Sequence, residues 1–334
     1  VHVRGKPLDS DVDLTQLAAY VKRNNRALDL LVEAAQRPRY YVPYVSPSNP
    51  PRMMDCLMRV SFRGWFSVNE ALTSRGALRA RGGKFDAAMQ DLAAARRLGR
   101  LIQQETSAIN AMVGMAVERF ALETMIGLAT SGRLDKKQSR ALLTILAQTH
   151  PMPMPGDFDE TIDRYFSLDY LTSWARDGLE MAARFGLDID LEPEVTVPDV
   201  NLDYDLLLRL HGESCAKATE AESQPTFRAR DKARKALSTP ATDEVKVVLK
   251  NHPEALHTQA RMAALIKRVG TGDPQRLTRL MHEMLVCSPQ IVDPAGITET
   301  TQAWAMMARL SAALAVYRAE NGRYPEKLNA LAPG

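Results

Sequence analysis

Apolar side chains recur every three to four residues along most of the chain, the spacing that places them on one face of an α-helix. Leu17, Val21 and Leu28 begin this pattern near the N-terminus, and it continues almost to the C-terminus with interruptions at glycine and proline. It predicts helices over residues 11–36, 53–81, 86–104, 108–130, 135–148, 157–185, 204–222, 228–237, 243–250, 251–269, 274–286 and 297–320. Residues 246–249 are the one run that also fits a strand. The pattern therefore predicts an all-α protein.

Three of the predicted helix ends share a local sequence. Gly83, Gly132 and Gly322 each follow a helix, and each is followed by a basic residue, an apolar residue and then Asp or Pro. Glycine takes up the left-handed conformation that ends a helix, and Asp or Pro begins the next one. Short corners of this kind join antiparallel helices in stacked hairpins. We therefore expect stacked helical hairpins, arranged as a right-handed superhelix or as an irregular array.

Two stretches without helical spacing are candidate domain boundaries. Three prolines alternate in residues 151–155, where they remove backbone donors and fix the backbone. Residues 187–203 form a longer stretch with two more prolines and alternating acidic residues, and we expect the boundary there. The predicted division is an N-terminal helical region over 1–186, a linker over 187–203 and a C-terminal helical region over 204–334. The alternative is that both regions pack as one continuous domain.

Composition excludes several classes of protein but does not indicate a particular function. Apolar residues make up 45% of the chain and charged residues 25%, which are the values of a folded globular protein rather than a disordered one. The net charge of +3 is too small for the field of a dedicated nucleic-acid binder. No apolar run reaches the roughly 18 residues that span a bilayer. The chain begins with Val1, so we expect that an upstream segment, and with it a signal peptide or membrane anchor, has been removed.

Several short motifs match a catalytic or metal-binding pattern only in part. Residues 214–217 have the SxxK spacing of penicillin-interacting enzymes but lack the later KTG, and His282 begins an HExxH motif that has no second histidine. His211 and Cys215 are one helical turn apart, as two metal ligands would be, without a second pair at ligand spacing. The three cysteines are expected to be buried thiols. We therefore predict no catalytic residue, no metal and no cofactor.

Tyrosine and arginine, the residues that dominate protein interfaces, are concentrated in two places. Three tyrosines lie in residues 37–51, where closely spaced prolines prevent a helix. Arginines are dense on the predicted hairpin over 75–100, and a second basic cluster covers 228–235. No aromatic residues alternate with these arginines, which makes nucleic acid an unlikely ligand. The candidate partner-binding residues are Tyr40, Tyr41, Tyr44, Arg96, Arg97 and Arg100, although ordinary packing is the alternative role for at least two of the tyrosines.

The hairpin over 68–104 resembles one tetratricopeptide repeat. The resemblance rests on small residues where two helices approach each other and on apolar residues that fill their interface, namely Gly76, Gly83, Phe85, Ala88, Leu92 and Ala95. It implies a helical hairpin of the kind that binds proteins or peptides. No second copy follows at the repeat spacing.

Most of the chain is similar, in the order of its segments, to uncharacterised helical proteins of planctomycete-type bacteria. The matching segments are residues 25–43, 85–99, 151–155 and 317–328. The sequence Asn-Gly-Arg-Tyr-Pro over 321–325 is also similar to the end of the long helix in type II secretion pseudopilins. These resemblances imply a bacterial protein and favour an envelope-associated or extracytoplasmic location, with a cytoplasmic one as the alternative.

Fold and residue types together favour a protein- or peptide-binding or scaffolding module. Stacked hairpins form extended concave surfaces, and the expected partner is another protein or a peptide. The alternative is an enzyme or small-molecule binder with a pocket between helices. A deep pocket with converging polar groups would favour the enzyme, whereas a shallow apolar groove would favour the module.

Overall fold

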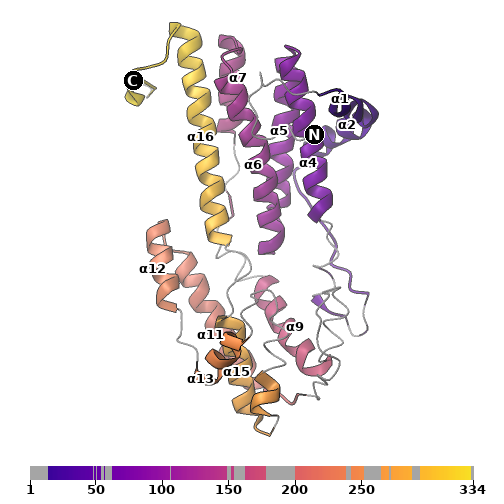
Figure 1. Cartoon of the computed structure of the whole chain (residues 1–334), viewed down its shortest axis with the longest axis vertical. Coiled ribbons are helices and arrows are strands. Elements are labelled where there is room, and N and C mark those ends of the chain that lie inside the picture. The colour runs from indigo at the N-terminus through magenta and orange to yellow at the C-terminus, as the bar shows by residue number, and fades with distance from the viewer. Residues whose placement is uncertain are drawn as a thin grey trace. The chain divides into compact units, whose positions relative to one another are not determined.

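Every regular element that the computed structural model describes is a helix (Figure 1). The structure describes residues 14–47, 49, 51–53, 56, 62–105, 107–148, 152–153, 162–177, 200–237, 242–251, 265–270, 272–287 and 294–331. Within these ranges there is no strand, and residues 246–249 lie in the helix α13, Asp243–Asn251. The predicted all-α class is confirmed for the described part of the chain, and the strand considered for 246–249 is wrong.

Contacts between residues divide the chain into two units that differ from the predicted regions. Unit 1 contains residues 1–42, 61–153 and 296–334, and unit 2 contains residues 43–60 and 154–295. The chain passes from unit 1 to unit 2 beside the alternating prolines of 151–155, the shorter of the two interruptions. It returns to unit 1 with its last long helix, which the sequence order had assigned to the C-terminal region. Most of the predicted linker, residues 187–199, lies outside the described residues.

Unit 1 is an array of helices with α5 near its centre. α5 packs against α4 and α6, and the two short helices α1 and α2 pack on α4 and α5. Large fully buried side chains, among them Leu72, Leu92 and Leu122, fill these interfaces. The helices of unit 1 are α1 (Thr15–Arg23), α2 (Asn25–Ala34), α4 (Phe62–Arg81), α5 (Phe85–Ile102), α6 (Ala108–Thr130), α7 (Lys136–Ala147) and, from residue 296 on, α16 (Pro294–Asn321), followed by the short 3-10 helix η1 (Leu328–Leu331).

The helix α16 joins unit 1 through small residues. Ala308, Ala312 and Ala315 are buried in one cluster with Leu122 of α6 and Leu142 of α7. At the C-terminal end of α16, Glu320 forms an ion pair with Lys136 of α7, in which Nζ and Oε1 are 3.5 Å apart. Thr298, near the other end, donates to the sulfur of Met115 on α6 at 3.5 Å. Side chains thus attach α16 to α6 and α7 along its length.

Local sequence explains where the helices begin and end. Gly83, Gly132 and Gly322 have φ angles of 75°, 69° and 72°, so the three predicted corners are confirmed as left-handed. Asp135 begins α7 with a capping box, in which its side chain accepts from the backbone of Gln138 at 2.7 Å. The α4 and α5 hairpin therefore turns at the predicted place.

The helix predicted over 11–36 is wrong in one respect, because it is broken in the middle. α1 ends at Arg23 and α2 begins at Asn25. The side-chain amide of Asn24, between them, donates to the backbone carbonyl of Tyr20 at 2.9 Å. A short polar side chain that bonds the nearby backbone competes with the helical hydrogen bonds. Apolar periodicity continues across the break and does not reveal it.

Unit 2 is a smaller set of helices around α11. Its described helices are α9 (Ile162–Asp177), α11 (Tyr204–Glu222), α12 (Phe227–Leu237), α13 and α15 (Pro274–Cys287), together with helical residues 265–269. α11 packs against α15, α12 and α9, and Leu171, Leu207 and Leu277 are buried in the shared core. Asp203 caps α11 by accepting from the Leu206 backbone at 2.9 Å. Asn251, predicted to begin the next helix, is the last described residue of α13.

Candidate binding surface

The first of the three predicted tyrosines fixes the start of a non-helical segment to unit 1. The ring of Tyr40 meets the ring of Trp65 edge to face, with centroids 5.6 Å apart. Its backbone amide donates to the side chain of Gln104 at 3.1 Å, and Gln104 donates back to the carbonyl of Pro38 at 3.4 Å. Burial raises the pKa of the Tyr40 hydroxyl. Tyr40 is therefore held by α4 and the end of α5, which is the packing role foreseen as the alternative.

The residues that follow Tyr40 expose large side chains. Tyr41 is 82% exposed, Val45 is 61% exposed and Tyr44 is 39% exposed. Pro43 and Pro47 keep this stretch from forming a helix. Tyr41 belongs to unit 1, whereas Tyr44 and Val45 belong to unit 2, so each side chain is an exposed feature of its own unit.

Two of the three predicted arginines lie inside unit 1 and share one carboxylate. Arg96 is 4% exposed, and its Nε lies 3.2 Å from Glu118 on α6. Its Nη1 also donates to the carbonyl of Ile145, near the end of α7, at 2.9 Å. The Nε of Arg100 is 2.6 Å from Glu118, which also accepts from Gln103 at 2.9 Å. Arg96 and Arg100 therefore connect helices, and of the three only Arg97 has no ion pair in the described part of the chain.

Glu118 is the residue of this cluster that the sequence did not suggest. It is fully buried, in a helix whose other buried side chains are mostly small or apolar. A carboxylate among the apolar residues of such a helix, with a dense arginine helix nearby in sequence, is a signal that could have predicted the pairing. The arginines were instead expected to form an exposed face.

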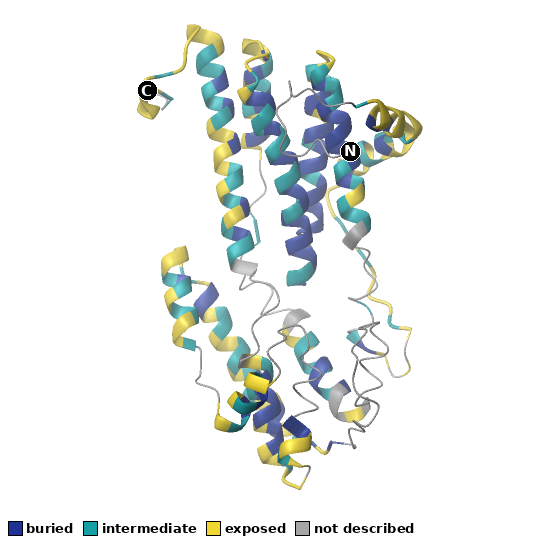
Figure 2. Cartoon of the chain, in the orientation of Figure 1, coloured by how far each residue is buried: buried dark blue, intermediate teal, exposed yellow. Residues whose placement is uncertain are grey.

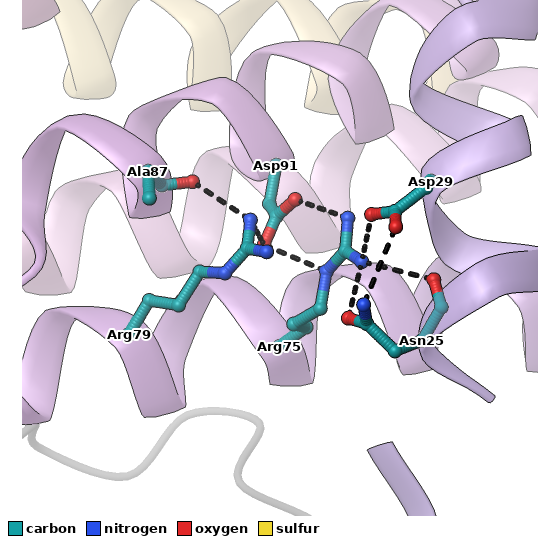
Figure 3. A network of polar contacts seen from close by, with 6 residues as sticks. All are labelled: Asn25, Asp29, Arg75, Arg79, Ala87 and Asp91. Carbon is teal, nitrogen blue, oxygen red and sulfur yellow. Dashed lines mark hydrogen bonds and ion pairs between the residues drawn. The ribbon is translucent and has the colours of Figure 1, made fainter. Parts of the chain in front are cut away.

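A second network, buried at Arg75 and Asp91, connects α2, α4 and α5 (Figure 3). Arg75 donates to both carboxylate oxygens of Asp91, at 3.0 and 2.7 Å, and its third nitrogen reaches Asp29 at 2.7 Å and the side chain of Asn25 at 2.9 Å. Arg79 donates to the same Asp91 at 2.8 Å. Such two-pronged charged bonds are strong and geometrically specific. The positive charge of Arg75 and Arg79 is thus directed inward.

The second basic cluster, on α12 in unit 2, is also largely paired. Arg230 is buried and donates to the carbonyl of Gln224 at 2.9 Å. Arg234 pairs with Glu222 at 3.3 Å, and Lys235 pairs with Asp231 at 2.7 Å. This cluster has the ion-paired character expected of an ordinary helix surface.

His211 and Cys215 of α11, the pair with the spacing of metal ligands, have a third potential ligand near them in the structure. The sulfur of Cys215 lies 3.4 Å from Nε2 of His211, which also bonds the carbonyl of Arg164 at 2.8 Å. The ring of His282, on α15, is 5.9 Å from the ring of His211. Burial lowers the pKa of His211, and it lowers that of His282 to about 4. Both imidazoles are therefore neutral near pH 7, and among the described side chains no three potential ligands are arranged to hold a metal.

One hollow in unit 1 is a mainly apolar groove. It has a volume of about 380 Å³ and lies between α2, α5 and α7. Its lining includes Val32, Met89, Ala93 and Ile145. A polar hollow of about 220 Å³ lies beside Gly132 and Arg318. The first of these is an apolar groove of the kind expected for a binding module.

No family model, no curated protein and no solved structure matches the chain significantly. Among the helices described, none is both long and apolar enough to cross a bilayer.

Proposed function

We propose that the chain is a protein- or peptide-binding module in which a stack of helical hairpins presents an exposed tyrosine. The observation that carries this proposal is the 82% exposure of Tyr41 directly after a fixed residue. Tyr40 is held by Trp65 and Gln104, so the backbone that leads into Tyr41 is restrained. Tyrosine supplies a large contact area with few rotatable bonds, and a restrained backbone lowers the entropy lost on binding.

The hairpin of α4 and α5 supports the same function. In the proposal it is a tetratricopeptide-like unit, and the surrounding helices continue it as an irregular superhelix. The apolar groove between α2, α5 and α7 is a hollow that the side chains of a bound peptide would fill. Exposed tyrosine and groove both belong to unit 1.

Affinity capture with a matched pair of variants tests the proposal. Full-length protein is crosslinked in cells, captured from separate envelope and cytosolic fractions, and analysed by mass spectrometry. We expect a reproducible, near-stoichiometric protein partner that is lost with Tyr41→Ala. Tyr165→Ala serves as the control, because Tyr165 lies on α9 in unit 2 and is 56% exposed. A partner that Tyr41→Ala retains, or the lack of any reproducible partner, would contradict the proposal.

A further inference from the structure

The helix α16 is apolar on two opposite faces. One face, with Ala308, Ala312 and Ala315, is buried against α6 and α7. On the other face, Met306 is 64% exposed, Met307 is 45% exposed and Leu310 is 40% exposed. A soluble surface helix normally has one apolar face and one polar face, and a helix that is apolar all round is normally buried all round. The outward face of α16 therefore has the composition of an interface.

The outward apolar residues form a regular stripe. Five of its members, Ala303, Met307, Leu310, Leu314 and Tyr317, follow one another at intervals of four and three residues, and Met306 lies beside them; the six are here called the outer stripe. Exposed and half-buried residues run along this helix (Figure 2). Alternating intervals of four and three are those by which one helix packs along another. Methionine is also common on surfaces that bind helices, because its flexible side chain adapts to the partner.

Positive charge that is not neutralised lies beside the outer stripe. Arg309 flanks it, is exposed and makes no ion pair among the described residues. Burial lowers the pKa of Arg96 most, Glu118 opposes this, and the charges of Arg100 and Arg309 lower it further, so Arg309 lies within electrostatic range of Arg96. Glu118 is the carboxylate that pairs with Arg96 and Arg100. Arg96 and Arg100 share this one carboxylate inside unit 1, so the exposed Arg309 adds a positive charge, unpaired among the residues described, at the edge of the outer stripe.

The size of the outer stripe favours a single helix as its occupant. From Ala303 to Tyr317 it runs for about 21 Å at the rise of an α-helix. A helix of the same length would cover it in full. A stable interface between two globular copies needs about 800 Å² from each partner, which a stripe one helix wide and four turns long does not supply by itself.

We propose that the outer stripe and Arg309 bind an amphipathic helix of another protein that carries acidic residues along one edge of its apolar face. The apolar side chains of that helix pack between the methionines and leucines of the stripe. Its carboxylates lie against Arg309 and balance that positive charge. This surface lies on α16 and does not depend on Tyr41, so either proposal can fail without the other.

The test uses two designed peptides with full-length protein. Both are capped 18-residue helices with the same leucines at helical spacing; one has glutamates along the edge of its apolar face, and the other has lysines at those positions. Fluorescence anisotropy measures their binding. We expect the glutamate peptide to bind at least about tenfold more tightly than the lysine peptide, which corresponds to about 1.4 kcal/mol. Equal binding of the two peptides, or binding of neither, would overturn the proposal.

Charge reversal in the protein locates the site. Arg309→Glu should weaken binding of the glutamate peptide and strengthen binding of the lysine peptide. Met306→Asp should weaken binding of both peptides. Arg228→Glu, an equal charge change at an exposed residue of α12 in unit 2, should alter neither. The three variants replace exposed side chains, and circular dichroism verifies that each is folded. If Arg228→Glu acts like Arg309→Glu, only the net charge matters, and the proposed site is wrong.

Sedimentation separates this proposal from self-association. The peptide proposal requires that wild-type protein leave the outer stripe accessible. A wild-type dimer that Met306→Asp converts to monomer would assign the stripe to a second copy of the chain and overturn the proposal. An unchanged molecular mass in wild type and Met306→Asp is the expected result.

Discussion

At the scale of single residues, the close approach of α5 and α6 depends on two glycines. A Cβ atom on Gly99 of α5 would lie 2.7 Å from the backbone nitrogen of Glu118 and 2.8 Å from the carbonyl oxygen of Gly114, both on α6. A Cβ on Gly114 would lie 2.6 Å from the carbonyl oxygen of Gly99. Both obstacles are backbone atoms, which cannot turn away as a side chain can. The two helices therefore touch main chain to main chain.

Gly99→Ala should accordingly destabilise unit 1 by about 1–3 kcal/mol, because α5 and α6 must move apart to admit the methyl group. Gly127→Ala is the matched control on α6, since a Cβ there meets nothing within 4 Å. It should be neutral or stabilising by up to about 1 kcal/mol through helix propensity. Urea unfolding followed by circular dichroism measures both, and similar effects of the two substitutions would contradict the close approach.

The carboxylate of Glu118 should contribute far more to the stability of unit 1 than a carboxylate in a more exposed ion pair does. Glu118→Gln leaves the buried Arg96 and Arg100 without a counter-charge, so we expect a loss of about 3–5 kcal/mol. Glu123→Gln is the comparison, because Glu123 lies on the same helix and pairs with the partly exposed Arg119 at 3.5 Å. It should cost at most about 1 kcal/mol. Urea unfolding measures the loss of stability in both variants. Equal losses in Glu118→Gln and Glu123→Gln would show that the ion pairs of Glu118 contribute little to the free energy of unfolding.

At the scale of elements, α11 and α15 meet through two neutral histidines that respond to acid. His211 and His282 have pKa values below the ordinary 6.5, with His282 near 4, because burial disfavours the charged form. The backbone hydrogen bond to Arg164 raises the pKa of His211 and the charge of Arg164 lowers it, without reversing the effect of burial; His211 also lowers the pKa of His282. Unfolded histidines take up protons at higher pH than the folded ones do. Stability is therefore present above about pH 6.5 and is lost as the pH falls toward 4.

We expect unit 2 to lose up to about 3 kcal/mol over that pH range, with His282 as the main contributor. Hydrogen exchange of the α11 and α15 amides at successive pH values reports it. His282→Gln should flatten the pH dependence, whatever it does to stability at pH 7. A dependence that is as steep in His282→Gln as in wild type would assign the effect to other groups.

Helix positions could be predicted from the sequence where one pattern decides them. The predicted bounds of 108–130 and 204–222 agree with α6 and α11, because periodicity and flanking caps indicate the same ends. The break at Asn24 could not be predicted, because one side-chain hydrogen bond decides it within an uninterrupted apolar pattern. Of the candidate site, the surrounding prolines predict the non-helical backbone of Tyr41 but not its exposure, because Tyr40 lies between the same prolines and packs on Trp65. The inward direction of Arg96 depends on Glu118, which only the packing of α5 on α6 brings near.

At the scale of the whole molecule, the order of segments along the chain does not give the order of packing. The boundary predicted at 187–203 followed from local proline and acidic content. The structure assigns residues on both sides of it to one unit and returns α16 to the other. Periodicity shows that α16 has an apolar face, but it carries no information about which helices that face meets.

Deleting α16 should consequently damage helices that are distant from it in sequence, α6 and α7, rather than the helices of unit 2 that directly precede it. A chain ending at residue 295 exposes the apolar residues of α6 and α7 that Ala308 and Ala312 cover. We expect amides of α6 and α7 to exchange at least about tenfold faster, corresponding to about 1.4 kcal/mol of lost protection, while those of α11 change little. A chain ending at residue 322, which removes η1 and keeps α16, is the control. Faster exchange in α11 rather than in α6 would contradict the division into units.

The return of α16 to unit 1 also determines the order in which the two units can complete folding during translation. The nascent chain exposes α6 and α7 first, and the helix that completes their core is translated only after residues 154–295. At usual elongation rates this delay is about ten to thirty seconds. Unit 2 can finish folding during that interval, while the apolar side of α6 and α7 is not yet covered by α16. Exposed apolar surface of this kind favours aggregation, so we expect slower translation of the last helix to increase aggregation of newly made chains.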